Sequence, residues 1–288
     1  MISYGFSTLG CPNYGVEEVI AIAKANGYRG VEIRFISGTV DLASLPEFAP
    51  EGIAATRRRF EDAGVAVVGV GTSVRMVSLD AAERAKQMDA AHRNVEIAAG
   101  LGAKYLRVFG GPLPAGQDRE RTLDAIASGL GAVGDLSASA GVTSLIETHD
   151  DFSRSPAILD LYRRGMSEAV EVLWDTLHTY RHGESASDTW GHLGPRMRLV
   201  HVKDAHVATP ERFDFALTGE GTVPVGSFID LLEAKGYDGF VNFEWEKGWH
   251  PEIAGPEVAF PHFIEWTRRR QGAAGRFRRG PAPSARAC

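Results

Sequence analysis

Eight short apolar segments alternate along the chain with eight longer amphipathic segments, and this alternation restricts the fold more than any other feature. The short segments are rich in β-branched and aromatic residues and are bounded by turn residues, which is typical of buried strands. The predicted strands are Ile2–Ser7, Gly30–Phe35, Val65–Val70, Tyr105–Phe109, Thr143–Glu147, Glu171–Asp175, Arg198–Lys203 and Phe240–Trp245.

The longer segments follow the helical repeat. In the first of them, Val16, Val19, Ile20 and Ala23 recur at positions i, i+3, i+4 and i+7, so one face of a helix would be apolar. The predicted helices are Val16–Asn26, Pro50–Ala63, Asp80–Leu101, Gln117–Ala140, Pro156–Arg164, Ser187–Leu193, Val225–Lys235 and Glu257–Arg270.

A regular alternation of strands and helices predicts a parallel sheet, which either closes into a barrel or stays open and doubly wound. No Gly-x-Gly-x-x-Gly motif follows the first strand, so the chief sign of a dinucleotide-binding fold is missing. Eight units match the strand count of a barrel, and such barrels often form one domain of about 250 residues. We therefore expect an α/β protein with a single (β/α)8 TIM barrel over residues 1–270. A flexible basic tail is expected over residues 271–288, which are rich in Gly, Pro, Ala and Arg.

The charge of the chain argues against nucleic-acid binding. The net charge is −6, and residues 271–288 carry arginines but no acid, so the body of the chain is more acidic still. No run of about 18 apolar residues is present, and the N-terminal MISYGFSTLG lacks the regions of a signal peptide. Cys11 and Cys288 alone cannot form a disulfide framework. We expect a cytoplasmic protein that binds neither nucleic acid nor membranes.

Polar residues close the last four predicted strands. The carboxyl ends of all strands in a parallel barrel meet at one face, where active sites are built. One acid at a strand end is as often a helix cap or a salt-bridge partner, but four polar residues on successive strands are hard to explain in that way. They are Glu147, Asp175, His201 and Glu244.

Three carboxylates at one mouth would repel one another and raise one another's pKa unless a cation lay between them. We therefore expect these four side chains to hold one divalent metal ion. Three oxygen ligands and one nitrogen suit Mn²⁺ first, and also Mg²⁺, Co²⁺ or Zn²⁺. Open coordination positions would accept oxygens of a substrate.

Eight phrases are spread along the chain: STLGCP, NGYRGVEIR, LIETHDDF, WDTLHTY, VHVKDAH, LTGEGTVP, GYDGFVNFEWE and WHPEI. Together they resemble the xylose isomerase-like sugar phosphate isomerase/epimerase superfamily, over about residues 1–270. That superfamily includes ketose 3-epimerases, inosose isomerases and dehydratases, 3-dehydroshikimate dehydratases and, more distantly, endonuclease IV. Its metal ligands follow the order Glu, Asp, His, Glu, which the resemblance places on the same four residues.

The resemblance also assigns roles beyond metal binding. In the epimerase branch the first and last Glu ligands act as acid and base, which implies catalytic roles for Glu147 and Glu244. His178 completes the family's Asp-x-x-His pattern, for which the resemblance implies contact with a substrate hydroxyl; the alternative is a histidine that caps the loop. Lys203 either holds a substrate oxygen or carboxylate or pairs with an acid.

Other polar residues near the strand ends have two interpretations each. His149 and Asp151 either orient the ligand Glu147 or are solvated loop residues. Arg34 and Arg107 either bind an anionic substrate group or form salt bridges with the acids at the rim.

The loops after the seventh and eighth predicted strands belong to the same face. Residues 205–221 are expected to form a long loop, which in a barrel is often functional. His206 lies in it, and His250 follows the eighth strand. Trp245 and Trp249 either floor the pocket or pack in the ordinary way.

The resulting hypothesis is a metal-dependent isomerase or epimerase that acts on a small polyhydroxylated or keto substrate through an enediolate. The alternative is a lyase on the same barrel, either an inosose or 3-dehydroshikimate dehydratase or a C-glycoside-eliminating enzyme. A phosphoesterase like endonuclease IV would need more metal ligands and a basic face. A non-catalytic barrel would not need the ligand set. The resemblance further implies a homodimer or homotetramer.

Overall fold

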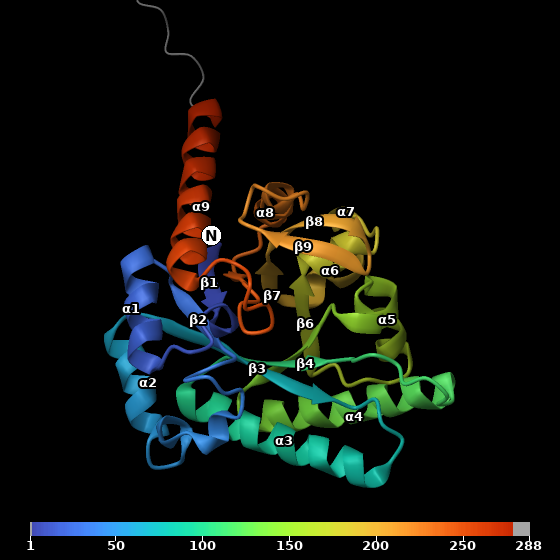
Figure 1. Ribbon diagram of the computed structural model, residues 1–288. Coiled ribbons are helices and arrows are strands. Elements are labelled where there is room, and N and C mark those ends of the chain that lie inside the picture. The colour runs from blue at the N-terminus through green and yellow to red at the C-terminus, as the bar shows by residue number, and fades with distance from the viewer. Residues whose placement is uncertain (1, 279–288) are drawn as a thin grey trace, which may run out of the picture.

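The computed structural model describes residues 2–278 of the chain, with side chains to residue 271. Eight parallel strands close into a barrel in the order β1-β10-β7-β6-β5-β4-β3-β2 (Figure 1). The predicted TIM barrel is therefore confirmed. The barrel strands are β1 Ser3–Ser7, β2 Gly30–Ile33, β3 Ala66–Arg75, β4 Tyr105–Phe109, β5 Thr143–Glu147, β6 Val170–Asp175, β7 Met197–Val202 and β10 Phe240–Phe243.

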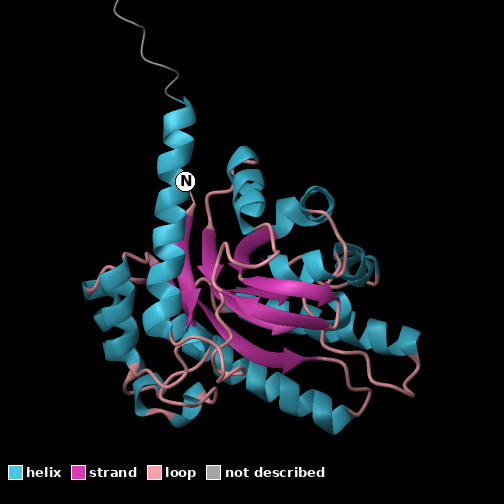
Figure 2. Ribbon diagram, turned by 45° about the horizontal axis from the view of Figure 1, so that its top comes forward, coloured by secondary structure: helices cyan, strands magenta, loops and turns pink. Residues whose placement is uncertain are grey.

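Helices surround the barrel on its outside (Figure 2). Local signals set their ends: Asp80 accepts a hydrogen bond from the Glu83 backbone N–H at the start of α3, and Gly27 ends α1 with a φ of 80°. The helices are α1 Val16–Asn26, α2 Ile53–Asp62, α3 Ala81–Leu101, α4 Arg119–Ser139, α5 Ser155–Arg163, α6 Thr176–Arg181, α7 Ala186–Leu193, α8 Val225–Ala234 and α9 Pro256–Arg278. Short 3-10 turns occupy Thr8–Gly10, Leu42–Ser44, Pro46–Phe48, Asp150–Phe152 and Gly194–Arg196.

The last helix is longer than the sequence indicates. It was expected to end at Arg270, but α9 continues to Arg278, so the expected tail begins inside a helix. Extending an existing helix needs no new nucleation, and this outweighs the two glycines in residues 271–278. The rest of the expected tail, residues 279–288, lies outside the described residues.

The expected long loop at residues 205–221 contains an antiparallel hairpin instead. Its strands are β8 Asp204–Thr209 and β9 Arg212–Ala216. The alternation Arg-Phe-Asp-Phe-Ala after a Pro-containing turn is the strand signal that the sequence prediction missed. The Asp204 carboxylate accepts hydrogen bonds from the N–H groups of Gly219 at 2.8 Å, Gly221 at 3.0 Å and Val223 at 3.1 Å. These bonds join the start of β8 to the segment that follows β9.

The apolar interior has two parts. A large cluster fills the space between the barrel and its helices. A small cluster fills the inside of the barrel, and it consists of Val68, Leu145, Leu173 and Leu199, with Tyr105 and Phe240 packed against it. Apolar side chains therefore fill the inside of the barrel up to this layer. Polar side chains line it only beyond the layer, toward the carboxyl ends of the strands.

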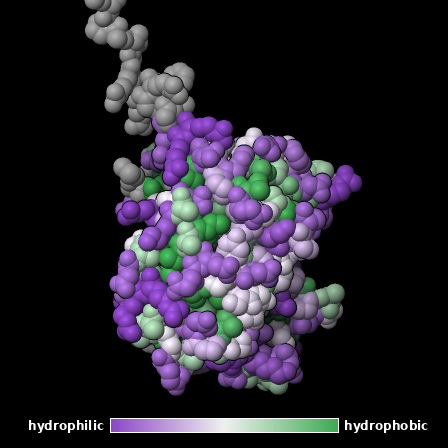
Figure 3. Space-filling model, turned by 60° about the vertical axis from the view of Figure 1, so that its left-hand side comes forward, coloured by the Kyte–Doolittle hydropathy of each residue, from purple (hydrophilic) through white to green (hydrophobic). Residues whose placement is uncertain are grey.

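The outer surface is mostly hydrophilic on the face shown in Figure 3, with small hydrophobic areas between polar ones. Across residues 2–278, none of the helices combines the length and the apolar character that a membrane crossing requires.

Candidate metal centre

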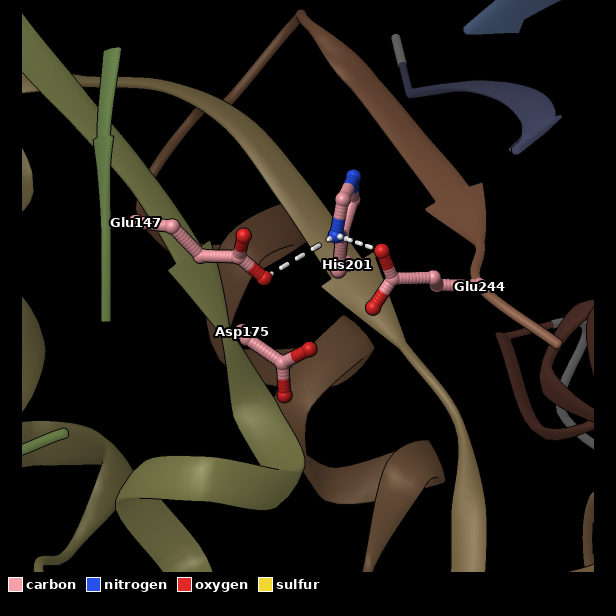
Figure 4. A group of neighbouring side chains, drawn as sticks. All are labelled: Glu147, Asp175, His201 and Glu244. Atoms are coloured by element: carbon pink, nitrogen blue, oxygen red, sulfur yellow. Dashed lines mark ion pairs between the residues drawn. The ribbon is translucent and has the colours of Figure 1, made fainter. Parts of the chain in front are cut away.

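The four predicted ligands meet at the carboxyl ends of four barrel strands. Glu147 ends β5, Asp175 ends β6, His201 lies in β7 and Glu244 follows β10 directly. Each offers one ligand atom, these atoms all lie within 4.8 Å of one another, and all four residues are buried. In Figure 4, Glu147 and Glu244 reach toward His201 from opposite sides, and Asp175 borders the same space.

The two-residue repeat of a strand explains why these side chains point inward. Alternate residues of a strand face the same side of a sheet. Leu145, Leu173 and Leu199 fill the inside of the barrel, and each stands two positions before a ligand. The ligands in β5, β6 and β7 therefore continue an inward-facing row past the apolar layer.

His201 is oriented by a carboxylate that the sequence analysis did not single out. Its Nε2 lies 2.6 Å from Oε2 of Glu32, a β2 residue that is 1% exposed. Asn242 Nδ2 also donates to that oxygen, at 3.3 Å. A carboxylate on the far nitrogen of a histidine fixes the ring and the proton on that nitrogen. The Nδ1 lone pair is thereby left for a cation.

Glu32 lies in the phrase GVEIRF, as one acid inside an apolar strand. This pattern is the signal that could have found it, because a charged residue is rarely buried without a partner. Glu32 lies on β2, outside the last four strands, whose ends carry the predicted ligands.

His201 Nδ1 marks the position that a cation would take. It lies 3.5 Å from Glu147 Oε1 and 3.2 Å from Glu244 Oε1. Burial lowers the pKa of His201, but Glu244 and Glu32 outweigh this and raise the pKa well above its usual range. The surrounding carboxylates thus stabilise a positive charge on the His201 ring. A metal ion that binds Nδ1 would displace the proton from that nitrogen.

Asp175 divides its two oxygens between two tasks. Oδ1 accepts hydrogen bonds from the backbone N–H groups of Leu177 at 2.9 Å and His178 at 3.1 Å, and so caps α6. Oδ2 contacts Lys203 Nζ at 2.8 Å. Burial raises the pKa of this carboxyl to about 6. The helix-cap interpretation of such an acid is therefore correct for Oδ1, and Oδ2, which faces Lys203, is the oxygen that the centre could use.

Two buried cations balance the carboxylates. Arg107 Nη1 lies 2.6 Å from Glu147 Oε2. Burial alone would raise the pKa of Glu147, but Arg107 outweighs it, and the pKa falls to about 2. Lys203 Nζ lies 2.5 Å from Glu244 Oε2 and 2.6 Å from Glu246 Oε1. For Arg107 and Lys203, the structure shows the acid-pairing alternative.

His178 and His149 lie together beside the centre, with ring centroids 4.3 Å apart. Arg181 Nε donates to His178 Nδ1 at 3.0 Å, so the His178 proton resides on Nε2, which lies 3.9 Å from Asp175 Oδ2. Burial, followed by His149, holds the pKa of His178 well below its usual range, so the ring is neutral. His149 Nδ1 lies 3.0 Å from Asp150 Oδ1.

Asp151 has a different place. Its Oδ2 accepts a hydrogen bond from the Leu113 N–H at 2.6 Å and so ties the loop after β5 to the loop after β4. It is an exposed loop residue, which agrees with the second of its two interpretations.

Arg34 is buried just after β2 and forms no salt bridge among the described residues. Its Nη2 donates to Ser73 Oγ at 2.7 Å, and its Nη1 donates to Gly71 O at 3.4 Å. The guanidinium lies over the Trp249 ring, 5.7 Å from its centroid. The salt-bridge alternative therefore fails for Arg34.

His206 and His250 line a separate cavity of about 680 Å³ between the β8–β9 hairpin and the loop after β10. Trp245 also lines it, but its ring is 1% exposed, stacks on Phe243 and donates to Ala254 O at 2.7 Å, so it packs in the ordinary way. Trp249 is 51% exposed.

The geometry fits a divalent ion. Around such an ion, neighbouring ligand atoms lie about 3 Å apart and opposite ones about 4.2 Å apart. The distances from His201 Nδ1 to the two glutamates correspond to neighbouring ligands, and the 4.8 Å span needs only a small contraction. Glu147 Oε1 and His201 Nδ1 have no hydrogen-bond partner within the described part of the chain. A set of three oxygens and one nitrogen suits Mn²⁺, Mg²⁺, Co²⁺ or Zn²⁺.

Solved structures with the same fold include proteins of several kinds. L-ribulose 3-epimerase has a TM-score of 0.79 and 18% identity, with all of both chains covered. The probable 3-DHS dehydratase AsbF of Bacillus anthracis, involved in petrobactin synthesis, has a TM-score of 0.77 and 16% identity over 93% of this chain and 99% of that one. The IolI protein, with a bound zinc atom, has a TM-score of 0.75 and 14% identity over 94% and 97%. Identities this low support the fold alone.

No curated protein sequence matches the chain. The sequence model of the xylose isomerase-like TIM barrel family, however, matches residues 20–270. This range covers most of the chain and contains all four candidate ligands. The chain therefore belongs to the xylose isomerase-like TIM barrel family.

Proposed function

We propose that the chain is a divalent-metal-dependent isomerase or epimerase that acts on a small sugar or keto-sugar. The observation that carries this proposal is the placement of Glu147 and Glu244 on opposite sides of His201 Nδ1, at 3.5 and 3.2 Å (Figure 4). Two carboxylates that face each other can remove a proton from one side of a carbon and return it to the other.

Glu147, Asp175, His201 and Glu244 would hold the ion, with Mn²⁺ as the first expectation. When bound, the ion supplies Lewis-acid polarisation of a substrate carbonyl, which makes the adjacent C–H more acidic. Arg107 and Lys203 keep Glu147 and Glu244 ionised, so each can accept a proton. The neutral His178 can donate its Nε2 hydrogen to a substrate hydroxyl.

A lyase is the second candidate, and His178 is the observation that favours it. Elimination needs a base for the proton and an acid for the leaving group. The His178 Nε2–H beside Asp175 is a donor separate from the two glutamates. An inosose or 3-dehydroshikimate dehydratase, or a C-glycoside-eliminating enzyme, would use the same first proton abstraction.

Proton NMR in D₂O of a panel of ketoses, inososes and 3-dehydroshikimate tests both candidates. An epimerase produces a new stereoisomer with deuterium at the inverted carbon, whereas a lyase loses water and produces a dehydrated product, which is aromatic from 3-dehydroshikimate and an enol or dione from an inosose. Glu147→Gln is expected to reduce turnover roughly 10²- to 10⁴-fold while substrate still binds. Full activity of this variant would remove Glu147 from the mechanism.

The matched control for Glu147→Gln is Glu51→Gln, because Glu51 is exposed and lies before α2. Its turnover is expected to equal that of the wild type. If manganese-loaded protein converts no member of the panel and incorporates no deuterium, the proposed function is wrong.

A further inference from the structure

Arg34 is a buried cation that no carboxylate of the described residues contacts directly. Among the described residues, the other buried cations at the barrel mouth are Arg107, which pairs with Glu147, and Lys203, which contacts three carboxylates. Arg34 is 5% exposed and forms no salt bridge within 4.0 Å in the same part of the chain. Burial and then the nearby Arg107 lower the pKa of Arg34 to about 9, and the more distant carboxylates of Glu244, Glu32 and Glu147 offset this only in part. Burying an unpaired charge is costly, so such a site is incomplete as it stands.

The Arg34 side chain runs beside the groups that support the metal centre. A Cβ atom placed on Gly71 would lie 3.0 Å from Arg107 Nη2, 3.0 Å from Glu32 Oε1 and 3.2 Å from Arg34 Cδ. The three side chains therefore converge on one glycine. Because Glu32 holds His201 and Arg107 holds Glu147, Arg34 belongs to the same mouth as the candidate ligands.

The guanidinium still has donors to offer. It carries five N–H groups, of which only one makes a short hydrogen bond, to Ser73 Oγ at 2.7 Å. Arg34 lines a cavity of about 220 Å³ with Thr72, Ser73, Asp41, Arg93 and Asn94. Two arginines and one aspartate give this cavity, which lies between the segment after β2, the end of β3 and α3, a positive balance. The planar fork of an arginine matches the paired oxygens of a carboxylate or phosphate.

We propose that Arg34 binds an anionic group of the substrate, so that the substrate is a keto acid or a sugar phosphate rather than a neutral sugar. This inference deepens the proposed function and rests on it, because it assumes that the reacting carbon lies at the metal centre. Binding of an anion at Arg34 can nevertheless be measured without any turnover.

The first test is calorimetric titration of the protein with inorganic phosphate and with acetate. It is made on manganese-loaded protein and again after chelator treatment, because an anion can also bind directly to a metal. We expect Arg34→Met to weaken phosphate or acetate binding at least tenfold in both forms. The control, Arg58→Met, removes the same charge from an exposed position on α2 and should bind as the wild type does.

Arg34→Lys separates charge from geometry. Lysine keeps the positive charge but cannot make the paired contact of a guanidinium, so we expect binding between that of wild type and that of Arg34→Met. Melting temperatures of the variants report whether they fold. Wild-type protein that binds neither anion in either form would overturn the proposal, whatever the fate of the variants. Equal binding by a folded Arg34→Met would also overturn it.

The second test compares paired substrates that differ only in their anionic group. Steady-state kcat/KM is measured for neutral ketoses, their phosphate esters and keto acids of similar size. Arg34→Met should lower kcat/KM for the preferred anionic substrate at least tenfold more than for its neutral counterpart, and the preferred class distinguishes phosphate from carboxylate. An equal loss for both members of each pair contradicts the role of Arg34. Absence of any turnover by the wild type contradicts the proposed function, while the titration still decides whether Arg34 binds anions.

Discussion

At the scale of single residues, the centre depends on pairs in which one side chain fixes the other. Glu32 holds His201 through Nε2 at 2.6 Å, and Arg107 holds Glu147 at 2.6 Å. Arg181 fixes the proton of His178 in the same way, through a bond at 3.0 Å. The side chains that would touch a metal or a substrate are therefore oriented before either binds.

Glu32→Gln is expected to weaken binding of a divalent ion by roughly 10- to 100-fold, which is the usual effect of losing a carboxylate behind a histidine ligand. Glutamine has nearly the same shape but no charge, so it stabilises the protonated Nε2 less well. Calorimetric titration of chelator-treated protein with Mn²⁺ measures the change. Glu51→Gln serves as the control, and equal affinity in the two variants would show that Glu32 does not tune the ligand.

At the scale of elements, the hairpin β8–β9 is fastened at its base by one side chain. The Asp204 carboxylate is 1% exposed and accepts three backbone hydrogen bonds from the segment that returns to α8. Arg181 reaches the hairpin from α6 by donating to Pro210 O, and its guanidinium lies 5.0 Å from the Phe213 ring centroid.

Asp204→Ala should destabilise the protein by roughly 3 kcal/mol or more, because it removes the carboxylate acceptor of four backbone N–H groups, those of Ala205, Gly219, Gly221 and Val223. Urea unfolding followed by circular dichroism measures the free energy of unfolding. Asp214→Ala, at an exposed position of β9, should change it by no more than about 0.5 kcal/mol. A similar loss in both variants would mean that the hydrogen bonds of Asp204 contribute little.

Most elements could be predicted because apolar periodicity is a local signal. Strands β4 and β5 and helix α1 have the expected bounds, since each is framed by clear turn residues. The hairpin and the short helix α6 were missed. Helix α6 starts on Asp175, whose capping bonds depend on how the end of β6 is placed in three dimensions.

The candidate site was partly predictable for the same reason. Four polar residues each interrupt an apolar strand, which the sequence shows directly. Glu32 on β2 reaches His201 on β7 across the inside of the closed barrel, and 169 residues separate them in the chain. The contact of Lys203 with Glu246 likewise depends on the pairing of β7 with β10. No local pattern contains that information.

At the scale of the whole molecule, metal binding at the candidate centre would be linked to folding. The four ligands come from β5, β6, β7 and the residue after β10, so an ion that binds them binds only the closed barrel. Such binding stabilises the native state by about 2.7 kcal/mol when the free ion exceeds its dissociation constant a hundredfold.

Thermal unfolding should therefore shift upward by roughly 5 °C on addition of saturating Mn²⁺ to chelator-treated protein. His201→Asn should abolish the shift, because it removes the imidazole ligand. The control His92→Asn changes an exposed histidine of α3 and should preserve the shift. A shift of the same size in His201→Asn would place the ion elsewhere in the molecule.

The apolar layer of Val68, Leu145, Leu173 and Leu199 closes the inside of the barrel beneath the candidate ligands. In the proposed function, substrate would therefore enter and product would leave by the same end of the barrel, and each product would have to depart before the next substrate binds.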